Sequence, residues 1–150
     1  MTNAPPVLRL LRPADWVKNV FVLPALVFSL PRMLQDGTEI VPALWSTLAA
    51  VAGFCATASG FYAINDALDA KSDRQHPVKC QRPIASGAIS VRTGLMMGVL
   101  LPPLSILAAG SIDASLGWIL FAYGMLQVFY NLGLKRCHGL DVMVLAGGFT

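Results

Sequence analysis

Long apolar segments are the feature that most constrains how this chain can fold. Four of them, at 17–34, 41–64, 93–111 and 114–134, approach or reach the roughly 20 residues that a helix needs to cross a hydrocarbon layer of about 30 Å. The composition agrees, because 55% of the residues are hydrophobic, 13% are charged and the mean hydropathy is +0.62. A helix satisfies its own backbone polar groups in lipid. The sequence therefore predicts an all-α fold, a polytopic transmembrane helix bundle.

A fifth apolar run opens at Leu140 and continues to Thr150. It supplies about half of the residues that a crossing requires. We therefore expect four complete spans plus the start of a fifth, with residues 1–150 forming the N-terminal portion of a single membrane domain.

Lysine and arginine gather at one set of span ends. They precede the first segment, lie between the second and third, and follow the fourth, whereas the opposite side holds only Arg32 beside the acids Asp36, Glu39 and Asp113. Cationic residues near span ends remain preferentially cytoplasmic. The sequence thus predicts a multi-pass protein of the cell membrane whose N-terminus and 65–92 connection are cytoplasmic. The net charge of +3 reflects this topology, and we do not read it as a sign of nucleic-acid binding.

Three aspartates stand where the second apolar segment ends. If its helix continues beyond the hydrocarbon, Asp66, Asp69 and Asp73 fall within a sector of roughly 60°, and Asn65 lies one turn before Asp69. Three like charges on one face destabilise a helix, and a divalent cation would neutralise them. Mg²⁺ takes one or two protein carboxylates and fills its other positions with water and phosphate oxygens. We predict that the three aspartates are catalytic and bind Mg²⁺, which bridges them to a diphosphate.

Basic residues follow the aspartates on a segment that Pro77 and Pro83 keep out of regular helix. Arg74, Lys79 and Arg82 are predicted to bind the diphosphate together with Asn65, since arginine makes forked contacts to phosphate oxygens and lysine acts as a point charge. The alternative is a solvated loop whose charges only enforce topology, and we prefer it for Lys71 and Arg92.

Two of the predicted helices carry faces suited to contact with neighbours. On the second segment, small residues recur every four positions, at Ala52, Ala56 and Gly60, and are interpreted as a packing stripe. On the fourth, one face collects the polar residues Tyr123, Gln127, Tyr130 and Asn131. This face should point into the bundle, where it either hydrogen-bonds to other helices or lines a substrate cavity.

The motifs together resemble a known family. Asn65-Asp66-x-x-Asp69-x-x-x-Asp73-Arg74-x-His76-Pro77-x-Lys79-x-x-Arg82-Pro83 resembles the first aspartate-rich motif and following loop of the UbiA-type intramembrane prenyltransferase superfamily. Two further segments are similar to the branch containing decaprenyl-phosphate phosphoribosyltransferase: Arg12-Pro13-x-x-Trp16-Val17-Lys18-Asn19, and Tyr130-Asn131-x-x-Leu134-Lys135 leading to Leu140-Asp141-Val142. The resemblance extends from about Leu10 to Thr150.

The resemblance implies a bundle of about nine transmembrane helices, in which two aspartate-rich motifs bind Mg²⁺ and a diphosphate. In the phosphoribosyl branch, phosphoribosyl diphosphate donates to a polyprenyl phosphate and diphosphate is released. By the same resemblance, substrate contacts are expected at Lys18, Tyr130, Lys135 and Asp141. The second aspartate-rich motif belongs to the C-terminal half of the family's fold, and nothing after Asp141 supplies it. We therefore expect residues 1–150 to be a truncated portion of the fold, inactive alone.

Two other functions remain open at this stage. A polyprenyl diphosphate could be the donor and an aromatic compound the acceptor, as in quinone-type biosynthesis, because both donors present the same metal-bound diphosphate. A polytopic transporter or scaffold would also explain the spans, but it gives no reason for three aspartates followed by Lys79 and Arg82. Diphosphate release on turnover separates an enzyme from this last class.

Overall fold

The structure is a computed structural model that describes residues 4–37 and 40–132. Every regular element within these ranges is helical, which confirms the predicted all-α class. The elements, in order, are α1 (Pro6–Leu11), the 3₁₀ helix η1 (Pro13–Val22), α2 (Leu23–Gln35), α3 (Ile40–Leu68), α4 (Ala70–Asp73), the 3₁₀ helix η2 (Lys79–Gln81), α5 (Val91–Ile112) and α6 (Ala114–Leu132).

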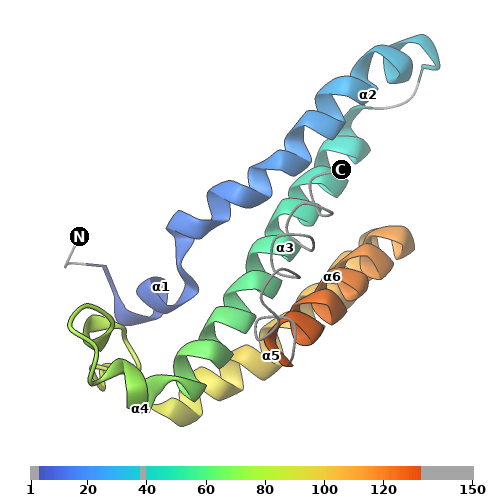
Figure 1. The fold of residues 1–150 in the computed structure, drawn as a ribbon. Helices are drawn as coiled ribbons and strands as arrows, with labels where there is room; N and C mark the ends of the chain where they lie inside the picture. The colour runs from blue at the N-terminus through green and yellow to red at the C-terminus, as the bar shows by residue number, and fades with distance from the viewer. Residues whose placement is uncertain (1–3, 38–39, 133–150) are drawn as a thin grey trace.

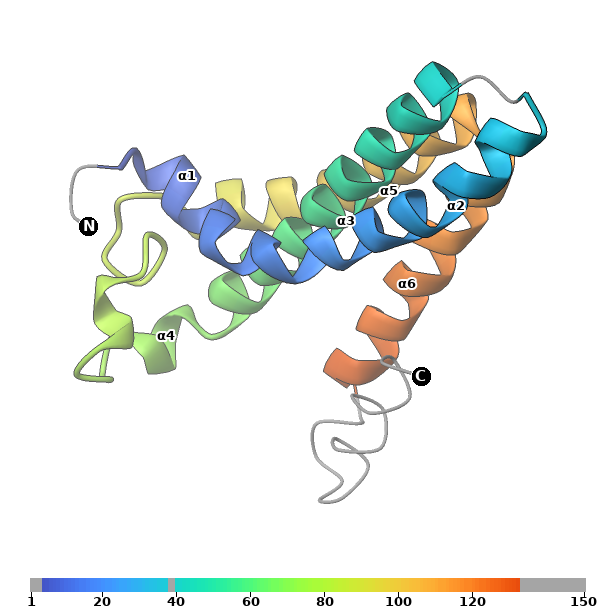
Figure 2. The ribbon, with the colours of Figure 1, turned by 90° about the horizontal axis from the view of Figure 1, so that it is seen from above.

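The long helices α3, α5 and α6 form the body of the bundle, and α2 runs beside the N-terminal part of α3 (Figures 1 and 2). α5 runs antiparallel to α3, and α6 turns back at Asp113 towards the end of the bundle where α3 finishes. At that end, α1 and the connection between α4 and α5 lie close together. Residues distant in the sequence thus meet at one end of the bundle.

Three helical segments of the described chain are long and apolar enough to cross a membrane: Pro13–Gln35, which joins η1 and α2, Ile40–Leu68 and Val91–Ile112. They correspond to the first three predicted spans. The fourth predicted span forms the 19-residue helix α6, which is not among these three. Large apolar side chains such as Phe21, Phe28 and Trp118 are exposed, as expected of surfaces that face lipid or further helices. The apolar run from Leu140 lies outside the described residues.

Glycine allows α3 and α5 to pack with their backbones in close contact. A Cβ placed on Gly60 would lie 2.7 Å from Pro102 Cδ, and one on Gly98 would lie 2.9 Å from the Gly60 carbonyl oxygen. The contact line along α3 continues through Gly53, where a Cβ would lie 2.5 Å from Leu120 Cδ1 of α6. The predicted packing stripe is therefore confirmed at Gly60. The close-contact residues of α3 do not recur strictly every four positions, because a helix has 3.6 residues per turn.

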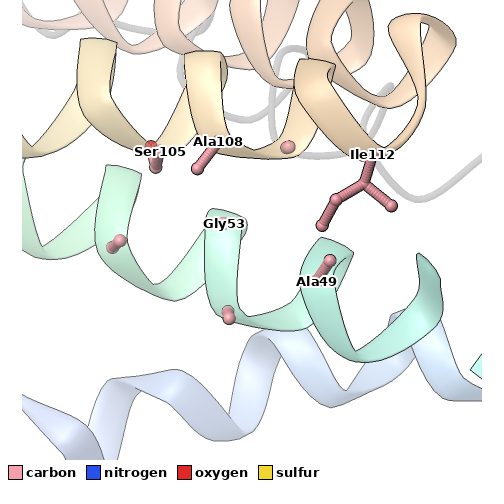
Figure 3. Close-up of a pocket in the computed structure, with 8 residues that line it drawn as sticks. Ala49, Gly53, Ser105, Ala108 and Ile112 are labelled. Carbon is pink, nitrogen blue, oxygen red and sulfur yellow. The ribbon is translucent and has the colours of Figure 1, made fainter. Parts of the chain in front are cut away.

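The other two members of the predicted stripe border open space. Ala52 and Ala56 line a cavity of about 250 Å³ between α3 and α5, together with Ala49, Gly53, Ser105, Ala108, Ala109 and Ile112 (Figure 3). Small side chains on both helices leave this space unfilled. The cavity lies next to the closest approach of the two helices.

A buried hydrogen bond joins α3 and α5 in the same region. Thr57 Oγ1 and Ser105 Oγ are 2.7 Å apart, and Ser105 also donates to the Pro102 carbonyl at 2.8 Å. We expect Thr57→Val to lower the free energy of unfolding by about 0.6 kcal/mol, the typical value for such bonds between membrane helices. Thr47→Val is the matched control, because the Thr47 hydroxyl bonds only to the Ala43 carbonyl of its own helix among the described contacts. Thermal unfolding of the complete protein in detergent would compare them; equal losses would contradict this expectation.

The polar face of α6 is occupied by bonds along the helix itself. Gln127 Nε2 donates to Tyr123 Oη at 2.8 Å, and Asn131 Nδ2 donates to the Gln127 carbonyl at 3.0 Å. The Tyr123 ring packs edge-on against Phe54 of α3, with 5.1 Å between centroids. Within the described residues, these two hydrogen bonds lie within α6, whereas interhelical bonds and a cavity wall were the two alternatives expected for this face.

Candidate active site

The acidic motif begins on the last turn of α3 and continues through a bend into α4. The amide of Asp69 still donates to the Asn65 carbonyl, and that of Asp73 to the Asp69 carbonyl, both at 2.9 Å. Asp66 and Asp73 are buried, with 2% and 4% of their side chains exposed, whereas Asp69 is exposed at the bend. All three carboxylates were expected on one face. The bend at Asp69, between the end of α3 and the start of α4, is why only two of them turn inward.

Two arginines neutralise the buried carboxylates. Arg82 Nη1 lies 2.7 Å from Asp73 Oδ2 and 3.2 Å from Asp66 Oδ1, so one guanidinium bridges both acids. Arg12 Nη2 donates to the same Asp66 Oδ1 at 2.6 Å. Removing one charged side chain from such a group would leave a buried charge without a partner, which is strongly destabilising. The two aspartates and two arginines therefore form a charge-balanced cluster, which we call the Asp66 cluster.

The N-terminal segment is attached to α3 by hydrogen bonds that position Arg12. Trp16 Nε1 donates to Ser59 Oγ at 3.0 Å, and Ser59 Oγ donates to the Leu11 carbonyl at 2.7 Å. One turn further along η1, Asn19 Nδ2 lies 3.3 Å from Cys55 Sγ. The Arg12 guanidinium also sits 4.9 Å from the centre of the Tyr62 ring, within cation–π range. These contacts explain why the Arg12-Pro13-x-x-Trp16 motif matters to the site.

Ser59 should be the most sensitive of these anchors. We expect Ser59→Ala to lower the free energy of unfolding by about 1–2 kcal/mol, because it removes one of the two acceptors of Trp16 Nε1 and the donor to the Leu11 carbonyl. It should also speed proteolytic cleavage within residues 4–22, measured by limited proteolysis in detergent. Ser29→Ala is the control, since Ser29 Oγ donates to the Leu26 carbonyl within its own helix. Unchanged cleavage in both variants would show that the segment is held by other contacts.

A small hydrophobic core supports the connection that carries Arg82. Leu10 of α1 and Ile84 of the connection are almost fully buried, and they cluster with Ile89 and with Ala63 and Ala67 of α3. Two arginine side chains also hydrogen-bond to backbone carbonyls of the connection. Arg9 Nη2 donates to the Gln81 carbonyl at 2.6 Å, and Arg74 Nε donates to the Ala85 carbonyl at 3.3 Å. The connection is thus held against both α1 and α3. It contains one turn of 3₁₀ helix, in agreement with the prediction that its prolines keep it out of regular helix.

The predicted site residues divide into two groups. The structure brings Asp66, Asp73 and Arg82 into direct contact. The others lie apart from that contact: Asn65 half-buried on α3, Asp69 and Lys79 exposed, Arg74 on a backbone carbonyl, Lys18 exposed and 3.7 Å from Asp15, and Tyr130 half-buried on α6. Lys135 and Asp141 lie outside the described residues.

Arg12 is the site residue that the sequence analysis missed. It was counted as a charge that sets topology and as part of the N-terminal motif, yet it makes the shortest contact to Asp66. The sequence feature that could have pointed to Arg12 was the motif itself, in which this arginine precedes Trp16 and Lys18 at the start of the first predicted span. No spacing rule connects Arg12 to a carboxylate 54 residues later.

The donor set of the Asp66 cluster suits a hard divalent cation. Two buried carboxylates converge on one guanidinium, and Mg²⁺ characteristically uses one or two carboxylates, completing its shell with water and phosphate oxygens. In the described part of the chain, no three His, Cys, Asp or Glu side chains are grouped closely enough to hold a metal ion by themselves. The cluster therefore fits a cation whose remaining ligands come from a bound anion.

Comparisons with known proteins identify the fold family. A profile of the UbiA prenyltransferase family matches residues 21–150. The chain is 33% identical over 143 residues to decaprenyl-phosphate phosphoribosyltransferase of Mycolicibacterium smegmatis, and 36% identical over 148 residues to that of Corynebacterium glutamicum; each alignment covers 95% of the chain and 44% or 42% of the relative. It is also 34% identical to the nodulation protein NoeC of Azorhizobium caulinodans, over 93% of the chain and 43% of the relative.

The chain spans less than half the length of these curated relatives. The profile nevertheless covers the aspartate motif, the basic connection and the helices α3, α5 and α6 that position them. This chain belongs to the UbiA prenyltransferase family.

Proposed function

We propose that the chain forms part of a membrane transferase that moves a 5-phosphoribosyl group from phosphoribosyl diphosphate to a polyprenyl phosphate, releasing diphosphate. The single observation that carries this proposal is the Asp66 cluster, a charge-balanced set of two carboxylates and two guanidiniums at one end of an apolar bundle. The names of the two phosphoribosyltransferase relatives supply the substrate classes.

A divalent metal is the cofactor generally used in this family, and we propose Mg²⁺ here, held by Asp66 and Asp73 with Asp69 at the exposed rim. When bound, it neutralises negative charge on the departing diphosphate. Arg82, Arg74 and Lys79 lie on the adjoining connection and are proposed to bind the phosphate oxygens, while Asn65 orients them from α3. This arrangement would favour positive charge at the ribose carbon that the lipid phosphate attacks.

An apolar cavity beside the cluster suits a polyprenyl chain. Its volume is about 420 Å³, and its lining includes Leu11, Trp16, Leu48, Ser59 and Leu101. Ser59 precedes Asp66 by seven residues, which is about 10 Å along the α3 axis. A lipid whose phosphate lies at the cluster could therefore extend its chain into this cavity. Lys18, Tyr130, Lys135 and Asp141 are proposed to contact the second substrate, on the cytoplasmic side that the distribution of basic residues predicts.

The test uses the complete reading frame expressed in membranes with Mg²⁺. Labelled phosphoribosyl diphosphate and a polyprenyl phosphate are expected to yield labelled lipid together with diphosphate, and chelation of the metal should stop the reaction. In parallel, a polyprenyl diphosphate is offered with an aromatic acceptor. If product forms only in this second assay, the donor is a polyprenyl diphosphate instead of phosphoribosyl diphosphate. That result would agree with the prenyl transfer after which the family is named. Diphosphate release in neither assay would favour a transporter or scaffold.

A further inference from the structure

Arg12 reaches Asp66 through a strained backbone. Its φ of 53° and ψ of 60° are left-handed, and it is the one non-glycine residue with positive φ in the described parts of the chain. An L-residue with a Cβ avoids this conformation, and such strain persists only where surrounding contacts enforce it. The contacts that enforce it are two hydrogen bonds to the preceding residue: the Leu11 carbonyl accepts from Trp16 Nε1 at 3.2 Å and from Ser59 Oγ at 2.7 Å.

The Asp66 Oδ1 atom is doubly occupied. Arg12 Nη2 lies 2.6 Å from it and Arg82 Nη1 lies 3.2 Å from it, and Arg82 has a shorter contact to Asp73. A cation that binds Asp66 through this oxygen competes with both arginines, and Arg12, which lies closer to the oxygen, is the stronger competitor. Arg12 is not fully buried, because 26% of its side chain is exposed.

Charge balance indicates where the displaced arginine goes. The cluster is neutral as it stands, so a divalent cation alone would leave it with two positive charges in a half-buried position, which is unfavourable. A diphosphate that enters with the cation compensates that excess. A guanidinium freed from Asp66 then has an anion within reach to which it can make forked hydrogen bonds.

We propose that Arg12 is an exchange residue: it neutralises Asp66 when no divalent cation is bound, and it transfers to the phosphate groups of the donor when a cation takes Asp66. This inference rests on the proposed function and adds a residue and an order of events to it. The exchange makes the binding of cation and diphosphate mutually dependent, since each favours the arrangement that the other requires.

The test measures binding, with Mn²⁺ and inorganic diphosphate as probes and the complete protein in detergent. Arg12→Gln is expected to bind Mn²⁺ about tenfold more tightly when diphosphate is absent, because the stronger competitor for Asp66 is gone. With saturating Mn²⁺, the same variant is expected to bind diphosphate about tenfold more weakly, because a phosphate contact is gone. Electron paramagnetic resonance of free Mn²⁺ and isothermal titration calorimetry give the two constants.

Arg92→Gln is the matched control, since it removes the same charge from an exposed side chain at the start of α5 that is not part of the proposed site. It should leave both constants near the wild-type values. Arg12→Lys keeps the charge and is expected to shift both constants in the same two directions by smaller factors. A merely structural role for Arg12 would weaken both kinds of binding, and that result would overturn the proposal.

Any other pattern in Arg12→Gln, including tighter Mn²⁺ binding with unchanged diphosphate binding, also overturns it. Failure of the proposed function has a separate signature. In that case the wild-type protein itself binds no diphosphate in the presence of Mn²⁺.

Discussion

Asp66→Asn is expected to lower the rate of the proposed phosphoribosyl transfer by about 10²–10³-fold. Asp66 is 2% exposed and contacts both arginines of the cluster, so the substitution removes the carboxylate that we propose to bind the cation. Asparagine has nearly the same shape but lacks the charge. The rate is measured as label transferred to polyprenyl phosphate in membranes that contain the complete protein, with expression checked by immunoblot.

Two further aspartates sharpen this experiment. Asp73→Asn should approach the effect of Asp66→Asn, because Asp73 is also buried and shares Arg82. Asp36→Asn is the matched control, since Asp36 is exposed at the end of α2, in the connection opposite the cluster. An activity of Asp66→Asn within a few-fold of the Asp36→Asn value would remove Asp66 from the proposed cation site.

Gly98→Ala is expected to lower the free energy of unfolding by about 2 kcal/mol through overpacking of α3 against α5. The added Cβ would lie 2.9 Å from the Gly60 carbonyl oxygen and 3.1 Å from the Ile64 amide nitrogen. Both are backbone atoms of the opposing helix and cannot move aside as a flexible side chain can. Thermal unfolding of the complete protein in detergent, followed by circular dichroism, measures the loss.

Gly124→Ala makes the same chemical change in a place with room for it. Its Cβ would come no closer than 3.9 Å to Ile106 Cδ1, an ordinary contact. Because alanine is the better helix former by up to about 1 kcal/mol, this control should be neutral or stabilising. A Gly98→Ala protein as stable as Gly124→Ala would show that the two helices separate easily.

The aspartate motif shows what residue spacing in the sequence can predict and what it cannot. The spacing of Asp66, Asp69 and Asp73 along an extended helix was sufficient to nominate the site, and contacts with Arg82 do join the first and last of them. The same spacing could not reveal the bend at Asp69, which leaves that side chain exposed. A helix-face argument assumes an unbroken helix, and the point at which a helix bends depends on what packs around it.

The packing line between α3 and α5 gives a second example. The repeat of small residues at Ala52, Ala56 and Gly60 identified the helix that packs closely, yet only Gly60 lies at the closest approach while the two alanines border a cavity. Composition reveals that a face can accept a neighbour. The crossing geometry, which depends on both helices, decides which of its residues make contact.

By itself, the sequence determined the all-α class, the apolar segments, the acidic motif and its basic connection, because each follows from hydropathy, helical periodicity or charge within a short window. Only the tertiary structure decided that Arg12 belongs to the Asp66 cluster. That contact joins residues 54 positions apart, and it exists because Trp16 and Ser59 hold a left-handed Arg12 against α3. Long-range pairing of this kind depends on how whole elements pack, which no local window of sequence contains.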